Sequence, residues 1–253
     1  MTTNSSDNPY ATPGSSLHEP RVNSGALSVE EALARDYDFR IGEVLGEAWH
    51  KLKGIKGTLI GAVLIYGVAI NVISFVIALV LGLLGLFQVS HAGTQVLEIV
   101  VNVFAGALCY PLLAGLNLIG IRRAADQPAE INEMFSHFGL FMPLFITGLG
   151  ITALIYLGMF LLLLPGIYLG VAYSLAVPLL VERNLSPWQA MEASRKAISK
   201  HWFKVFGLFL AIGGILLLSA IPLGIGLVWT LPMAIIAIGV LYRTIFGVLP
   251  PAN

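Results

Sequence analysis

Three polar side chains within the apolar segments of this chain could take part in moving ions or protons. Glu98 and Asn102 are four residues apart, so a helix places them on one face, and Asn117 follows in the same segment. A carboxylate that exchanges a proton, with an amide as a neutral ligand, could form part of a translocation path. The simpler interpretation is that Glu98 lies in water at the start of its helix and that Asn117 pairs helices.

A second group of residues could bind anionic lipid headgroups. It consists of four basic residues flanked by two tryptophans: Trp188, Arg195, Lys196, Lys200, Trp202 and Lys204. A lysine or arginine at a membrane surface contributes roughly 1 kcal/mol to the attraction of anionic lipid. The alternative is that this segment only anchors and orients the chain, and one segment can do both.

Enzymatic chemistry is not expected. The five histidines are scattered, and no paired carboxylate, nucleophile elbow or phosphate-binding loop occurs. The single cysteine, Cys109, excludes an internal disulfide and a cysteine-based metal site. Fourteen basic and fourteen acidic residues give no net charge, which argues against nucleic acid as a partner. We therefore expect no enzyme, no metal and no cofactor.

The composition indicates a membrane protein. Of the 253 residues, 57% are hydrophobic and 11% are charged, with a mean hydropathy of +0.85. A soluble protein carries about 25% charged residues, so this chain has too few to cover its apolar surface. The predicted fold class is all-α, a polytopic membrane helical bundle.

Apolar runs long enough to cross a bilayer predict about six spans. A polar patch ends the first span, and a hairpin at Pro165 and Gly166 separates the third from the fourth. The predicted spans are residues 58–87, 97–121, 139–164, 166–182, 203–221 and 226–246. Glycines that suit close helix packing, or hinges in a transporter, lie at Gly148, Gly150, Gly158, Gly213 and Gly214.

The distribution of charge predicts the topology. With six spans and both termini in the cytoplasm, every basic residue falls on the cytoplasmic side. Residues 1–37 are rich in polar residues and proline, and we expect a disordered cytoplasmic tail there. Residues 38–250 are the expected membrane domain, located in the bacterial inner (plasma) membrane.

Amphipathic helices are expected beside the spans. Apolar residues recur every three or four positions over residues 40–56, and a second helix is expected over 187–201. The second begins with Ser186, Pro187 and Gln189, which form a capping-box pattern. A weaker pattern around Ile131 suggests three units, each an interfacial helix followed by two spans. The alternative is that any helix entering a membrane shows such residues.

Residues 163–206 carry a resemblance to a known family. The pattern consists of residues 163–168, 175–182 and 190–194, followed by His201 and Trp202. It resembles a family of uncharacterised bacterial six-span inner-membrane proteins, and the membrane domain fused to some glycerophosphodiester phosphodiesterases. The resemblance covers roughly residues 40–246 and implies a six-span fold with a cytoplasmic elbow helix. It implies no activity, because the family has no established catalytic motif.

The expected function is therefore a non-enzymatic one. We expect membrane or envelope organisation through lipid, a protein partner or self-association at the cytoplasmic helices. The alternative is a small-solute or ion transporter or channel whose second span lines the path.

Overall fold

The computed structural model describes residues 26–85 and 91–250, and this part of the chain is helical with no strand. The α-helices and the two short 3-10 helices, η1 and η2, follow in this order: α1 (Val29–Ala34), α2 (Ile41–Lys51), α3 (Lys56–Leu83), α4 (His91–Leu108), α5 (Tyr110–Ala124), η1 (Ile131–Phe135), η2 (Phe138–Leu140), α6 (Phe141–Leu161), α7 (Leu163–Ala172), α8 (Ala176–Arg183), α9 (Pro187–Ser199), α10 (Trp202–Ala220) and α11 (Leu227–Phe246).

The helices confirm an all-α, multi-pass membrane protein. Five helical segments are long and apolar enough to cross a bilayer, and the bent pair α4–α5 makes a sixth if it counts as one span. Those five are residues 56–83, 131–161, 163–183, 202–220 and 227–246. The first of these, 56–83, agrees with the predicted span 58–87 at its start. The predicted end of that span, residues 86 and 87, lies outside the described residues.

The second predicted span, 97–121, falls within the pair α4–α5, which passes as a span only when the two helices are taken together. Helices α4 and α5 meet at Cys109 with a bend of 54°. The cause is Pro111, which has no N–H to donate to the carbonyl of residue 107 and whose ring crowds that carbonyl. At the second position of a new helix the missing N–H costs nothing, so the chain starts α5 there.

The hairpin between α6 and α7 lies earlier than predicted. The chain reverses at Leu162, whose backbone is extended (φ −159°, ψ 132°), whereas Pro165 and Gly166 lie inside α7. Proline is tolerated in the first turn of a helix, so Pro165 does not break α7. Gly166 instead permits close approach, because a Cβ there would lie 2.7 Å from the backbone nitrogen of Met159.

The fourth predicted span, 166–182, lies within the candidate span of residues 163–183, and its helix is interrupted part-way along. Helix α7 ends at Ala172 and α8 begins at Ala176. Pro178, in the first turn of α8, cannot donate to the carbonyl of residue 174, so the hydrogen-bond ladder is interrupted. Each of Pro111, Pro165 and Pro178 thus lies in the first turn of a helix that begins just after an interruption.

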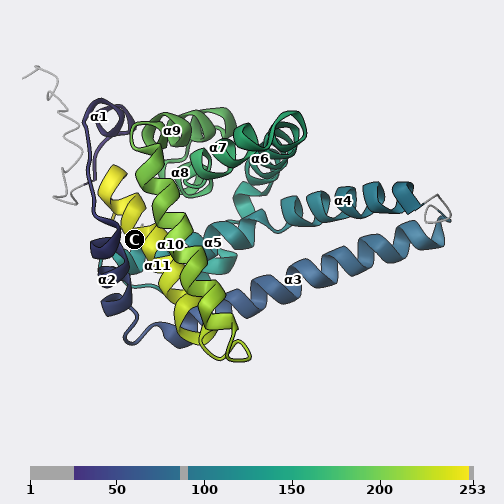
Figure 1. The fold of residues 1–253 in the computed structure, drawn as a ribbon, viewed down its shortest axis with the longest axis horizontal. Helices are drawn as coiled ribbons and strands as arrows, with labels where there is room; N and C mark the ends of the chain where they lie inside the picture. The colour runs from purple at the N-terminus through teal and green to yellow at the C-terminus, as the bar shows by residue number, and fades with distance from the viewer. Residues whose placement is uncertain (1–25, 86–90, 251–253) are drawn as a thin grey trace, which may run out of the picture.

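The centre of the molecule is formed by α5, α8 and α11, whereas α3 and α4 extend away from it as a long antiparallel hairpin (Figure 1). Half of the largest fully buried side chains of the described residues lie on these central helices: Ile119, Ile121, Leu179, Leu180, Tyr242 and Phe246. In contrast, the most apolar stretch of α3 has no buried residue. Its side chains have lipid as their natural environment.

Two glycines set the distance between α5 and α11. A Cβ on Gly120 would lie 2.7 Å from the carbonyl oxygen of Ile235, and one on Gly239 would lie 2.6 Å from the carbonyl carbon of Gly120. Neither glycine was singled out from the sequence. Among the predicted packing glycines, Gly148 and Gly158 do make close contacts, whereas Gly213 and Gly214 face open space.

The N-terminal region differs from its prediction as a disordered tail. Residues 1–25 lie outside the described residues, but α1 occupies 29–34 within the expected tail. It begins with a capping box, in which the Ser28 hydroxyl accepts from the N–H of Glu31 and the Glu31 carboxylate accepts from the N–H of Ser28.

Helix α2 is shorter than the interfacial helix predicted over 40–56, and its apolar stripe faces protein. Val44 and Ala48 are buried against the core, and α2 packs along α11. Only Trp49 of the stripe is substantially exposed. The third expected interfacial helix, around Ile131, is made of the short helices η1 and η2 instead.

The start of α3 lies beside the start of α11. The ammonium group of Lys56 sits 5.6 Å from the centre of the Trp229 ring. Helix α2 runs along α11. The turn between α2 and α3 then leads from the region where α11 ends toward the region where α11 begins. The predicted topology placed these two helix starts on opposite sides of the membrane, so this proximity differs from it.

We expect Gly239→Ala to destabilise the protein by at least about 2 kcal/mol, because a methyl group there must displace the backbone of α5. Thermal unfolding in detergent measures the change. Gly213→Ala is the matched control: it adds the same methyl group in open space within α10 and should stabilise the helix by about 0.5–1 kcal/mol. Equal effects of the two substitutions would contradict the assigned crossing.

Candidate functional site

Helix α9 carries three of the six residues expected to bind lipid, namely Trp188, Arg195 and Lys196. It starts at Pro187 after an N-cap serine, Ser186, whose side chain exchanges hydrogen bonds with Gln189. The preceding helix α8 ends at Asn184, which adopts a left-handed conformation (φ 50°) and turns the chain. Local sequence signals thus determine where this elbow begins.

Ser194 fastens α9 to the break between α7 and α8. This side chain is fully buried; its hydroxyl donates to the carbonyl oxygen of Ala172 (2.6 Å) and accepts from the N–H of Leu175 (3.2 Å). Both backbone groups lie at the interruption in the helical ladder. Since an unpaired buried backbone group costs about 1–3 kcal/mol, Ser194 allows the break to be buried.

The two cations in the middle of α9 share one acid. Arg195 donates to both carboxylate oxygens of Glu192 at 2.8 Å, and the Lys196 ammonium lies 3.4 Å away from the same carboxylate. The bonds from Arg195 lower the pKa of Glu192 to about 2. Glu192, and to a lesser degree the Tyr168 hydroxyl, raise the pKa of Arg195. Two positive charges thus face one negative charge, and both cations remain partly exposed (37% and 56%).

The remaining basic residues of the predicted lipid site bind the protein itself. Lys200 donates to the carbonyl oxygens of Leu33, in the last turn of α1, and of Arg35, its C-cap residue. Lys204 pairs with Asp38, and this bond lowers the pKa of that carboxyl group. We call residues 27–40, which lie across the ends of α9 and α11, the strap (Figure 1).

Further contacts hold the strap in place. His201 Nε2 lies 2.8 Å from the carboxylate of Asp36, which lowers the pKa of Asp36, and the Tyr37 hydroxyl donates to the carbonyl oxygen of Ala197. At the other end, Arg183 donates to the carbonyl oxygen of Leu27 (2.7 Å). Acidic side chains of the strap therefore occupy part of the predicted headgroup cluster.

The two tryptophans have different environments. Trp188 is 68% exposed, whereas Met191 and Ile198 on the same helix are buried. Trp202 is half-buried and stacks on Phe206 with the ring centres 5.0 Å apart. Its indole N–H donates to the carbonyl oxygen of Tyr168. Trp188 is therefore the freer of the two.

An apolar groove begins at this aromatic cluster. It has a volume of about 320 Å³ and lies between α6, α7 and α10. Phe206, which stacks on Trp202, forms part of its wall, and Gly166 and Gly170 leave room on the side of α7. Tyr168 is in the same turn of α7, and its hydroxyl is 2.6 Å from that of Ser199. Tyr168, which follows the groove-lining Ile167, therefore connects this side of the groove to Ser199 of α9.

The predicted translocation residues are not brought together. Glu98 and Asn102 are exposed on α4, and Asn102 donates to the backbone carbonyl of Glu98 (2.8 Å) within its own helix. Asn117 is half-buried on α5, beyond the bend at Cys109. None of the three lines the cavities found in the described part of the chain.

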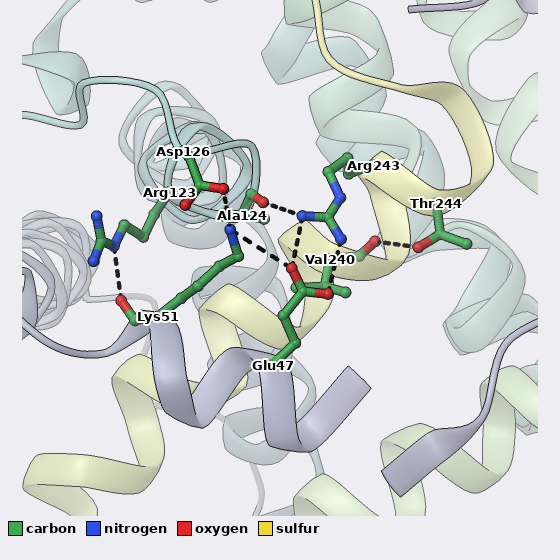
Figure 2. A network of polar contacts seen from close by, with 8 residues as sticks. All are labelled: Glu47, Lys51, Arg123, Ala124, Asp126, Val240, Arg243 and Thr244. Atoms are coloured by element: carbon green, nitrogen blue, oxygen red, sulfur yellow. Dashed lines mark hydrogen bonds and ion pairs between the residues drawn. The ribbon is translucent and has the colours of Figure 1, made fainter. Parts of the chain in front are cut away.

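A polar network lies next to α2, the helix that follows the strap, and the sequence analysis did not identify it. Arg243 at the end of α11 makes two hydrogen bonds to Glu47 of α2, at 2.7 and 2.8 Å, and one to the carbonyl oxygen of Ala124 (Figure 2). Lys51 pairs with both Glu47 and Asp126. These contacts join α2, α5 and α11 at their charged ends.

One local sequence signal could have revealed the helix in the strap. Ser28 and Glu31 match the capping-box pattern, which marks the start of α1. By contrast, the pairing of Glu47 with Arg243 joins residues 196 positions apart, and no local pattern indicates it.

Comparison with known proteins gives distant relatives. The chain is 28% identical over 181 residues to the uncharacterized protein Mb2590 of Mycobacterium bovis and to the uncharacterized protein MT2637 of Mycobacterium tuberculosis. The similarity covers 64% of this chain and 55% of each relative, so the chain spans about half the length of the curated relatives it matches. No protein-family model and no solved structure matches it.

We expect Ser194→Ala to destabilise the protein by about 1–3 kcal/mol, because it leaves the carbonyl of Ala172 and the N–H of Leu175 buried without their partner. Thermal unfolding in detergent provides the measurement. The control is Ser219→Ala, which removes a hydroxyl that bonds only to the carbonyl four residues earlier in α10. A loss no larger than that of the control would show that Ser194 does not support the break.

Proposed function

We propose that this chain is a non-enzymatic, multi-pass protein of the bacterial inner membrane that binds an anionic phospholipid at α9. The observation that carries the proposal is the link from Arg195 through the Tyr168 hydroxyl to α7, where the next residue on the N-terminal side, Ile167, lines the apolar groove. Lys196 shares the acid partner of Arg195. A phospholipid needs both features, a cationic site for its phosphate and an apolar channel for an acyl chain. Through this contact, or through a protein partner or second copy, the protein would organise the membrane.

The charges at α9 support an anionic headgroup. Glu192 balances one of the two cations, so the site keeps one positive charge for a lipid phosphate. The Tyr168 hydroxyl, which contacts both Ser199 and Arg195, adds a further polar group beside this site. Trp188, exposed at the first turn of α9, has the amphipathic side chain that is typical at the headgroup level. Lys200 and Lys204 contribute less to lipid binding in this proposal, because Lys200 already donates to a strap carbonyl and Lys204 already pairs with Asp38.

The alternative, a transporter or channel, has less support, because Glu98, Asn102 and Asn117 line none of the cavities in the described part of the chain.

We also propose membership in the bacterial six-span inner-membrane family on the basis of the pattern over residues 163–206. The distant similarity to two uncharacterised bacterial proteins is compatible with that proposal.

The proposed orientation has both termini in the cytoplasm. It rests on the placement of all basic residues on one side of a six-span arrangement. The contact of Lys56 with Trp229 is in tension with it, since it brings the start of α3 near the turn between α10 and α11. The side of the membrane on which this turn lies therefore tests the proposed orientation directly.

We expect a cysteine at position 223, in the turn between α10 and α11, to react with a membrane-impermeant maleimide in intact cells. A cysteine at position 53, before α3, should react only after the membrane is opened. Both variants, Leu223→Cys and Lys53→Cys, are made in a Cys109→Ala background, and Leu223 itself is 95% exposed. Labelling of both from the same side would overturn the six-span topology.

We expect the double variant Arg195→Gln, Lys196→Gln to lose most of its binding to phosphatidylglycerol, because roughly 1 kcal/mol per cation corresponds to more than tenfold in affinity for two. The thermal shift on adding phosphatidylglycerol to detergent-purified protein measures this, with phosphatidylcholine as the uncharged comparison. Lys53→Gln, which removes a cation away from α9, should leave the shift unchanged.

The groove is tested separately by filling it. Gly170→Leu places a side chain in the groove, and a Cβ at that position meets no atom closer than 4.0 Å, so the protein should fold. We expect this variant to lose the shift caused by the full phospholipid but to keep binding glycerophosphoglycerol, which lacks acyl chains. Gly213→Leu is the control in open space. An unchanged phospholipid shift in Gly170→Leu would remove the groove from the proposal.

A further inference from the structure

A second cavity, separate from α9, lies where the end of α5 and the end of α8 meet the last described residues of the chain. Its volume is about 280 Å³, near the lower limit for small-molecule sites. The polar groups in its wall are Arg122, Gln127, His137 and Glu182. The wall also contains Leu249 and Pro250, which are exposed, so the cavity lies close to the surface.

One cationic group in this wall has unused donors. Arg122 donates through Nε to Glu133 at 2.7 Å, and both side chains are mostly buried. No contact in the described part of the chain uses its two terminal nitrogens. Because Glu133 already offsets its charge, Arg122 suits a singly charged planar anion such as a carboxylate better than a dianion.

Two acceptors in the same wall lack donors. The side-chain oxygen of Gln127 is buried and has no hydrogen-bond partner among the described residues, while its nitrogen donates to the carbonyl oxygen of Leu249 (2.9 Å). Nδ1 of His137 lies 3.2 Å from the carbonyl oxygen of Glu133 and must donate to it. In the neutral ring this leaves Nε2 as an acceptor. A buried acceptor without a donor is costly, so the Gln127 oxygen favours a ligand that donates to it.

The remaining acid in the wall is already engaged. Glu182 accepts from the Tyr242 hydroxyl, from Arg183 and from the N–H of Leu249 (2.7 Å). Its charge is therefore balanced inside the protein and does not repel an anion. Arg183 in turn holds the carbonyl oxygen of Phe246, which keeps this segment in place.

We propose that this cavity binds a small hydroxycarboxylate. The carboxylate would pair with the terminal nitrogens of Arg122, and a hydroxyl group would donate to the oxygen of Gln127 or to His137. The inference does not depend on lipid binding at α9, because the two sites share no residue.

The test uses three probes of similar size on the purified full chain in detergent: D-glycerate, propionate and glycerol. Glycerate has both a carboxylate and hydroxyl donors, propionate lacks the donors, and glycerol lacks the charge. Isothermal titration should show binding of glycerate at least tenfold tighter than either of the others. Equal binding of propionate or glycerol, or no binding of glycerate, would overturn the proposal.

Two substitutions at one position locate the site. Gln127→Leu removes the unpaired acceptor and should weaken glycerate at least tenfold. Gln127→Glu keeps the acceptor and the length of the side chain but adds a charge that repels the anion, so it should also weaken glycerate binding. It replaces Gln127→Leu in the test if that variant does not fold. Lys53→Gln is the distant control. Undiminished glycerate affinity in a folded Gln127 variant would place any binding elsewhere and overturn the assignment. Retained phosphatidylglycerol binding in the same variant separates this result from a failure at α9.

Discussion

The close approach of α5 and α11 is the constraint on which the rest of the structure depends. With a glycine on each helix at the crossing, the two backbones touch, and α8 and α2 can then pack around a narrow centre. In an apolar environment helices gain little from hydrophobic burial, so such van der Waals contact between backbones is a main source of association. The crossing also brings the end of α5 within reach of Arg243, which bonds to the last carbonyl of that helix.

Basic residues in this protein act largely as internal ties. Arg183, Lys200 and Arg243 each bind backbone carbonyls of segments distant in the sequence, and each lies at or near a helix end. Carbonyl groups at helix ends are unpaired within the helix and carry partial negative charge, so cations are favourable there. The same charges that orient a chain in a membrane can therefore also fix its tertiary contacts. Arg195 and Lys196 differ because their acid partner is on the same helix.

The fold class and most spans could be predicted because apolar length is a local property of the sequence. The exact breaks could not be predicted, because a proline indicates a nearby interruption but not the residue at which the next helix begins. Pro165 and Pro178 both lie in the first turn of the helix that follows the break. The elbow helix and its basic cluster were recognisable from the residues around Ser186. That Lys204 would meet Asp38 was not, because the two are 166 positions apart and their contact depends on the packing of α9 and α10.

The strap has a consequence for how the protein would respond to its membrane. Its carboxylates are attached to the same chain as the lysine and histidine they contact, so they act at the high effective concentration of a tethered ligand, on the order of millimolar. Any anion from outside the protein could therefore reach Lys204 or His201 only by displacing a carboxylate that the chain itself holds next to them.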